Sequence, residues 1–300
     1  MELVTYRIRH TTEYKYEAPV SIAHNEAHLA PRDTPFQHAV ATRFAVDPHP
    51  TSIARHRDYF GNWLHRFALE EPHQSFTMTS SSRVTVQPAP ERDMAESPPW
   101  EEVLHHLQTA TESDAIEAFE LCFRSPVVQW EEDIRTYAAR SFPKGRPLLE
   151  GAWDLTHRIY KDFKYQPGVT TVSTPVSEVF RARRGVCQDF AHFQIACLRS
   201  LGLSARYVSG YLLTHPPPGT PKLVGADESH AWVSVYCPRF GFVDLDPTND
   251  VIVSHEHTTV AWGRDYGDVT PLRGVVLGGG NHTVEVSVDM SPVAPGDPPS

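Results

Sequence analysis

The sequence predicts an α+β protein in which a set of helices precedes an antiparallel sheet. Segments with apolar residues at helical spacing fill residues 100–163, whereas alternating strand patterns fill residues 205–245. Helices and strands are thus grouped along the chain and do not alternate, so a doubly wound parallel sheet is not expected. Residues 1–88 alternate like strands throughout, which predicts a small β-sandwich domain ahead of the helices.

The N-terminal region contains short strand-like segments separated by turn residues. Apolar and polar side chains alternate around Tyr6, Phe44, Phe67 and Val84. The dipeptide Gly61-Asn62 between two of these segments predicts a two-residue hairpin turn. We find no catalytic constellation here, and expect the region to pack against a neighbouring site.

Proline and turn residues suggest the domain boundaries. Residues 87–99, QPAPERDMAESPP, have the composition of a linker. We expect a β-sandwich domain over 1–90, a linker over 91–99, a catalytic domain with leading helices over 100–276, and a C-terminal strand with a frayed tail over 277–300. Within the catalytic domain, apolar spacing predicts helices over 100–110, 115–123, 134–142 and 148–163.

The stretch that organises the chain is RGVCQDFAHFQIACLRSL, residues 184–201. It predicts a tight turn, a cysteine, and a helix that is apolar over most of its circumference. Cys187 falls in the first helical turn, where free N–H groups and the helix dipole favour the reactive thiolate. Gly185 allows a sharp turn before the helix, and Gly202 supplies a left-handed C-terminal cap. Taken alone, the segment is equally compatible with an inert core cysteine.

Two further residues fit the requirements of a thiol nucleophile, which needs a nearby base that is oriented by a third group. His230 begins a predicted strand, and Asp246 ends the next one, immediately before Pro247. In an antiparallel hairpin the start of one strand lies beside the end of the next, so both side chains reach the same end. Each residue alone is more often structural, but with Cys187 they indicate a Cys-His-Asp triad. Asp244 is the competing carboxylate.

Composition narrows the classes of function. The formal net charge of −10 argues against nucleic acid or an anionic membrane as the main partner. Cysteines at 122, 187, 197 and 237 show no CxxC pair, so we expect reduced thiols, a cytoplasmic location, and neither a metal nor a cofactor. The N-terminus lacks the apolar run of a signal peptide, and no stretch approaches eighteen apolar residues.

Three blocks of the sequence resemble the transglutaminase-like superfamily, which has a papain-related cysteine fold. They are GVCQDFAHFQIACLRSLGLSARYVSGYL, ESHAWVSVY and GFVDLDPTND. DYFGNWLHRF and WGRDYGDVTPLRGV resemble segments of its bacterial branch, which carries an N-terminal β domain. The resemblance implies a papain-like, transglutaminase-like catalytic domain with Cys187 as nucleophile, His230 as general base and acid, and Asp246 orienting the imidazole. No acidic calcium loop is present, so a calcium-triggered cross-linker is not expected.

The expected activity is attack of the thiolate on an amide of a peptide or isopeptide substrate, through a thioester intermediate. Hydrolysis is the first interpretation, and acyl transfer to an amine uses the same residues. The alternatives are a catalytically silent peptide-binding module, a zinc site built from Cys, His and Asp, and acyl transfer from a coenzyme A thioester. The Cys187 N–H is one oxyanion donor; the second donor, the substrate and the oligomeric state are not assigned by the sequence.

Overall fold

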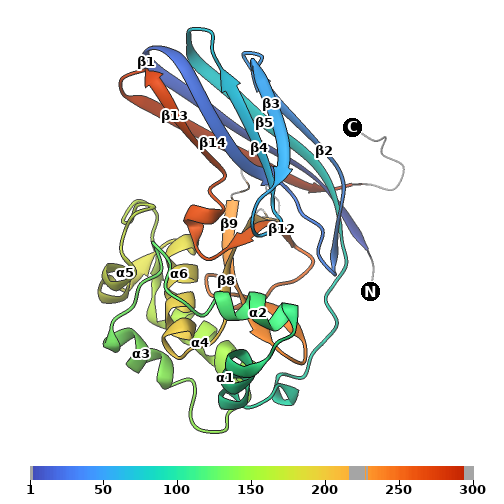
Figure 1. The fold of residues 1–300 in the computed structure, drawn as a ribbon, viewed down its shortest axis with the longest axis vertical. Helices are drawn as coiled ribbons and strands as arrows, with labels where there is room; N and C mark the ends of the chain where they lie inside the picture. Colours follow the sequence, from blue (N-terminus) through green and yellow to red (C-terminus); the bar gives the residue numbers. More distant parts are fainter. Residues whose placement is uncertain (1–2, 216–226, 228, 294–300) are drawn as a thin grey trace.

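The computed structural model describes residues 3–215, 227 and 229–293, and it contains a β-rich region joined to an α+β region (Figure 1). A large twisted sheet occupies one end of the molecule, and the helices with a smaller sheet occupy the other. The predicted α+β class is confirmed. Among the described residues, no helix is long and apolar enough to cross a membrane.

The large sheet is organised around one long strand, β1 (Val4–Ala30). The first half of β1 pairs with β5 (His73–Val86) and β14 (His282–Pro292); its second half pairs with β4 (Trp63–Leu69) and β13 (Leu272–Gly278). Strands β2 (Gln37–Asp47) and β3 (Ser52–Arg57) flank β5 and β4. Apolar residues from both halves form one buried cluster: Tyr16, Val20, Ala23, Ala27, Leu29, Phe67, Leu69, Phe76 and Met78. A single sheet curled about β1 therefore forms this core, where two separate sheets were expected.

The C-terminal strands belong to the same sheet. Tyr6 lies opposite Pro292 and Tyr16 opposite His282 in the β1–β14 ladder. The alternation at 283–288 predicts the strand itself, but not its partner, because the pairing joins opposite ends of the chain. Strands β13 and β14 are consequently part of the first sheet and not a separate tail, and the α+β region is inserted between β5 and β13.

The prediction of a two-residue turn at Gly61-Asn62 is wrong, because the connection is longer. Strands β3 and β4 are joined by residues 58–62, and the Gly61 N–H bonds the Asp58 carbonyl at 3.0 Å. Gly61 has a φ of +73°, which glycine adopts without strain. Asn62 is completely buried and its side chain bonds residues outside the hairpin, so a two-residue turn that exposed it is not formed.

In its described residues, the second region holds six α-helices and a five-stranded antiparallel sheet in the order β11-β10-β9-β8-β12. The helices are α1 (Trp100–Thr109), α2 (Ser113–Glu120), α3 (Glu132–Ala139), α4 (Leu148–Asp162), α5 (Val176–Ala182) and α6 (Cys187–Ser200). The strands are β8 (Ala205–Leu212), β9 (Ser229–Cys237), β10 (Gly241–Asp246), β11 (Val251–Ile252) and β12 (His257–Gly263). Helix α6 is buried along nearly its whole length and packs between the other helices and strands β8 and β9.

Short elements complete the region. The two-residue strands β6 (Lys164–Tyr165) and β7 (Arg184–Gly185) pair in parallel just before α6. Single 3₁₀ turns, η1 (Met94–Glu96) and η2 (Tyr266–Asp268), lie in the two connections to the large sheet. Gly202, with a φ of +82°, ends α6 as predicted, and the Leu203 N–H bonds the Leu198 carbonyl at 3.1 Å.

Candidate active site

Cys187 is the first residue of α6, as the sequence predicts, and its side chain is partly buried. The first N–H groups of a helix have no acceptor within it, so the Cys187 N–H points away from the helix ladder. The turn before it is fixed by Asp189, whose Oδ2 accepts the Val186 N–H at 2.8 Å and the Thr170 hydroxyl at 2.6 Å. Burial raises the pKa of Asp189 despite these two hydrogen bonds. The thiol is thus held at a rigid helix start.

Gly185 has a different role from the predicted sharp turn. Its φ is not in the left-handed region, which Arg183 occupies instead with a φ of +54°. A Cβ at Gly185 would lie 2.6 Å from Asp189 Oδ2 and 2.8 Å from Asp189 Cβ. Glycine is therefore required because the buried carboxylate approaches the backbone closely, and not because the chain reverses there.

The structure brings the other two predicted residues together. His230 Nε2 lies 2.7 Å from Asp246 Oδ2, and the two side chains are 9% and 0% exposed. The Cys187 thiol also interacts with this ring, because it raises the pKa of His230 together with Asp246. Because Nε2 faces the carboxylate, Nδ1 is the ring nitrogen left for the sulfur. The imidazole accordingly bridges the helix-start thiol and a buried acid.

Protonation of this pair follows from its contacts. Burial would lower the pKa of His230, but hydrogen bonds to Asp246 and Cys187 outweigh it and raise that pKa above its usual value. Burial would raise the pKa of Asp246, but its hydrogen bonds to His230 and His257 lower it well below the usual range. An ionised carboxylate beside a protonated imidazole is the favoured state, which is the partner that a thiolate needs.

Asp246 is oriented by three residues that the sequence does not predict: Thr248, Asn249 and His257. Oδ1 accepts the backbone N–H groups of Thr248 (2.8 Å) and Asn249 (3.3 Å). Oδ2 accepts the Asn249 side-chain amide at 2.7 Å and lies 3.3 Å from His257 Nε2. Asn249 follows directly in the DPTN turn and could have been proposed from it. His257 comes from β12, whose pairing with β8 is not visible in the sequence.

Asp244, the competing carboxylate, is not in contact with His230. Its Oδ2 accepts the Trp232 indole N–H at 3.2 Å. The Trp232 ring is completely buried, and its centroid lies 6.1 Å from that of His230 and 5.3 Å from that of His257. Asp244 therefore fixes an aromatic neighbour of the two histidines and leaves Asp246 as the acid beside them.

His230, Asp246 and His257 place one ligand atom each within 4.8 Å of one another, which is close enough to hold a metal ion. The hydrogen bonds of His257 are not those of a metal ligand. His257 Nδ1 accepts the Ser254 N–H at 3.4 Å, so the ring proton is on Nε2, facing Asp246. A histidine that binds metal through Nε2 carries its proton on Nδ1 and donates it. These contacts describe a hydrogen-bonded pair of histidines on one carboxylate.

A cleft of about 440 Å³ opens beside His230. Two half-exposed tyrosines line it, Tyr160 from helix α4 and Tyr165 from strand β6. The remaining lining residues are Leu212, Thr214, Thr248 and Asn249. Apart from His230, no lining side chain is charged, so the cleft suits an uncharged segment of substrate.

The β-rich sheet, the α+β region and the paired thiol and imidazole together define a papain-like protein. Two family models match the chain: the bacterial transglutaminase-like N-terminal region over residues 6–85, and the transglutaminase-like superfamily over residues 135–247. The chain belongs to the transglutaminase-like superfamily.

The similarity to two mycobacterial proteins extends over almost the whole chain. A Mycobacterium tuberculosis protein described as uncharacterised is 44% identical over 295 residues, which are 96% of this chain and 92% of that protein. A Mycobacterium leprae protein, also described as uncharacterised, is 33% identical over 96% of this chain and 99% of its own. A protein-glutamine gamma-glutamyltransferase of Pseudomonas aeruginosa is 30% identical over 105 residues, 32% of this chain and 16% of that protein.

A solved structure shares the fold. The crystal structure of a candidate cysteine protease from Cytophaga hutchinsonii matches with a TM-score of 0.77 and 21% identity. The match covers 100% of this chain and 94% of that one. Sheet and helical region thus occur together in another protein with low sequence identity, which confirms the predicted fold class.

Proposed function

We propose that this protein is a cysteine-nucleophile enzyme that cleaves amide bonds. Cys187 is the nucleophile, His230 the general base and acid, and Asp246 the residue that orients the imidazole. One observation carries the proposal: the His230 ring is held by a buried carboxylate at 2.7 Å, and its pKa is raised by this carboxylate and by the thiol at the start of α6. A nucleophile, a base in contact with it and an orienting acid are the parts that covalent acyl chemistry requires.

The chemical steps follow from these positions. The Cys187 thiolate attacks the carbonyl carbon of the amide, and the negative oxygen that develops is met by the Cys187 N–H. The C–N bond then breaks, the amine leaves with the proton of the His230 imidazolium, and a thioester remains on the sulfur. Water, deprotonated by His230, attacks the thioester and releases the acid, while the proton on His230 restores the starting ion pair.

Hydrolysis is the reaction we favour, on a peptide or protein amide. The cleft beside His230 opens to solvent and is lined by tyrosine, leucine and threonine side chains, with no acidic residue to hold a second amine substrate. This lining favours peptides with uncharged side chains at the cleaved bond. The four cysteines are unpaired, and three are buried, which supports a reducing compartment such as the cytoplasm.

Acyl transfer to an amine is the second candidate. The observation in its favour is the 105-residue similarity to a protein named as a protein-glutamine gamma-glutamyltransferase. Both reactions pass through the same thioester, so they differ only in whether water or an amine attacks it. The third candidate, a silent peptide-binding module, would keep the cleft but give no product.

A peptide-library digest tests all three. Wild type and Cys187→Ser would each be incubated with the library, with and without methylamine, and the products identified by mass spectrometry. New peptide termini that appear with wild type alone support hydrolysis. Methylamine incorporated into glutamine or at cleaved bonds supports transfer. The absence of both kinds of product would refute the enzyme proposal.

A further inference from the structure

The catalytic sheet ends at β12, which pairs with β8 on one side only within the described residues. In Figure 1 this strand lies directly beneath the large N-terminal sheet. An edge strand presents a row of unpaired N–H and C=O groups, which proteins normally cover or shield. Side chains of the N-terminal region cover this edge, and they connect that region to the candidate site.

Two side-chain amides from the N-terminal region replace a neighbouring strand. Gln37 Oε1 accepts the Thr259 N–H at 2.8 Å, and its Nε2 donates to the Thr259 carbonyl at 2.7 Å. Asn62 Oδ1 accepts the Trp262 N–H at 3.0 Å, and its Nδ2 donates to the Trp262 carbonyl at 2.8 Å. Each amide therefore satisfies both backbone groups of one residue, as a paired strand residue would. We call Gln37 and Asn62 the edge amides.

A bulge in β12 places both residues on the open edge. In a regular strand, residues an even number apart offer their N–H and C=O groups to the same side. Thr259 and Trp262 are three apart, but the register with β8 shifts between Thr259 and Ala261. The extra residue restores the phase, so the backbone groups of both face the N-terminal region.

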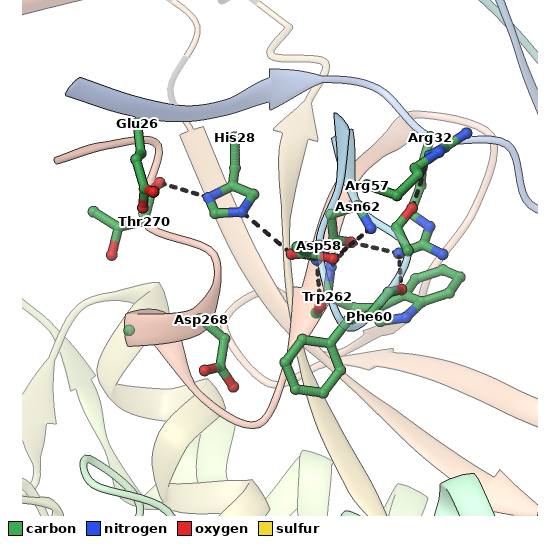
Figure 2. Close-up of polar contacts among 12 residues, drawn as sticks. Glu26, His28, Arg32, Arg57, Asp58, Phe60, Asn62, Trp262, Asp268 and Thr270 are labelled. Carbon is green, nitrogen blue, oxygen red and sulfur yellow. Dashed lines mark hydrogen bonds and ion pairs between the residues drawn. The ribbon is translucent and has the colours of Figure 1, made fainter. Parts of the chain in front are cut away.

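The edge amides are themselves held in one orientation. Arg32 accepts from Gln37 Nε2 through its carbonyl at 2.7 Å, and its guanidinium donates to Asn62 Oδ1 and stacks on the Trp262 ring. Asp58 accepts both the backbone N–H and the side-chain amide of Asn62, at 2.7 and 2.8 Å (Figure 2). Turning either amide over would place oxygen against a carbonyl oxygen, so only the observed orientation fits.

The strand held in this way carries His257 at its start. His257 is 5% exposed, its Nε2 lies 3.3 Å from Asp246 Oδ2, and its ring packs edge-on against Trp232. Asp246 and Trp232 are both neighbours of the His230 ring, whose centroid also lies 6.0 Å from that of His257. Displacement of β12 would therefore move a hydrogen-bond donor away from Asp246 and loosen the packing beside His230.

We propose that Gln37 and Asn62 are positioning residues for the Cys187–His230–Asp246 site, acting through β12 and His257. The N-terminal sheet is thereby part of the catalytic unit and not only a neighbour of it. This inference rests on the proposed function, and it assigns the N-terminal region a role that the family models do not.

The test compares apolar replacements of similar shape with matched controls. Gln37→Met and Asn62→Leu remove the edge amides. Gln87→Met and Asn281→Leu change the same residue types directly after β5 and directly before β14 of the same sheet. Each of these side chains makes one exposed hydrogen bond, to the Pro35 carbonyl and to Glu17 respectively. If Asn62→Leu does not fold, Gln37→Asn tests the same idea, because its amide is one methylene too short to reach Thr259.

Three measurements are made on each variant: hydrogen exchange of residues 257–263, alkylation of Cys187 by iodoacetamide at pH 6.5, and kcat and KM on a peptide cleaved in the library digest. With the edge amides removed, we expect exchange in β12 to accelerate by about tenfold or more, because buried backbone groups lose their partners. Alkylation and kcat should each fall by about tenfold, with KM within about twofold, as expected for coupling through a packed strand. Both controls should match wild type.

Two results would overturn the inference. Unchanged exchange in β12 would mean that the amides do not hold the edge, and faster exchange with unchanged alkylation and kcat would mean that they hold it without positioning the site. Failure of the proposed function looks different, since wild type itself would then show no selective alkylation of Cys187 and no turnover.

Discussion

Replacement of Asp246 by asparagine tests the assignment of the orienting acid most directly. Asn is nearly the same shape, so the question is where its NH₂ group would go. Oδ1 faces the N–H groups of Thr248 and Asn249, which an NH₂ group would oppose. The NH₂ group therefore takes the place of Oδ2, because the donors that it opposes there are side chains. The Asn249 amide can rotate and the rings of His230 and His257 can change tautomer, whereas backbone N–H groups cannot.

This orientation of the new asparagine side chain reverses the tautomer of the His230 ring. To accept a hydrogen bond from the new NH₂ group, His230 Nε2 must be unprotonated, so a neutral ring carries its proton on Nδ1, toward Cys187. A ring in that tautomer cannot take the thiol proton, and the imidazolium loses its carboxylate partner. The same replacement in the serine-protease triad lowers kcat by about 10⁴-fold. We expect a loss of about 10³- to 10⁴-fold here, or about 4–5.5 kcal/mol of transition-state stabilisation.

The assay is kcat on a peptide found in the library digest, with Cys187 alkylation at pH 6.5 as a measure of the ion pair that needs no turnover. Asp244→Asn is the matched control, because it changes the same residue type on the same strand, and its side chain contacts Trp232 and interacts with Arg206 but does not contact His230. We expect the control to stay within about threefold of wild type, as for a residue outside the reacting groups. Activity of Asp246→Asn within tenfold of wild type would refute the tautomer argument.

Three other outcomes are expected. Iodoacetamide near neutral pH should label Cys187 before the buried Cys122, because burial raises the pKa of Cys122 to about 12. Mass spectrometry measures the labelling, and equal labelling of the two cysteines would contradict a reactive thiolate at Cys187. Cys187→Ser should abolish turnover with a Tm within about 5 °C of wild type, since the thiol is partly buried and contributes little packing; a larger fall in a thermal melt would make it a core residue. The His230 ring, with its pKa raised by Asp246 and Cys187 against the effect of burial, stabilises the fold fully below its ordinary pKa of 6.5 and loses this contribution as the pH rises toward about 10. The free energy of unfolding, measured in urea, should therefore differ more between wild type and His230→Gln at pH 6 than at pH 9.5, and an equal difference would argue against the ion pair.

The features predicted correctly from sequence depend on local patterns. The spacing of apolar residues defines α6, and the positions of Cys187 and Gly202 at its two ends follow directly from that spacing. His230 and Asp246 lie at facing ends of β9 and β10 because two strands joined by a short turn pair antiparallel. Each of these inferences uses residues close together in the chain, where few alternatives compete.

The features that were missed depend on contacts between distant segments. His257 reaches Asp246 only because β12 returns to the far side of β8, and β14 pairs with β1 across most of the chain length. Asn62 was interpreted as a turn residue from its neighbours, whereas its partner Trp262 lies 200 positions away. Such pairings are chosen by the burial of whole faces, and a single sequence contains no local signal for them.

The insertion of the α+β region between β5 and β13 has a mechanical consequence. The chain leaves the large sheet after Val86 and returns to it at Leu272, and both flanking strands pair with the one long strand β1. A region attached at a single point could swing about its connection, whereas one attached at two points on the same rigid frame has no free hinge. Any opening of the cleft must then come from segments within the α+β region, such as the one that carries Tyr165, and not from a swing of the whole region.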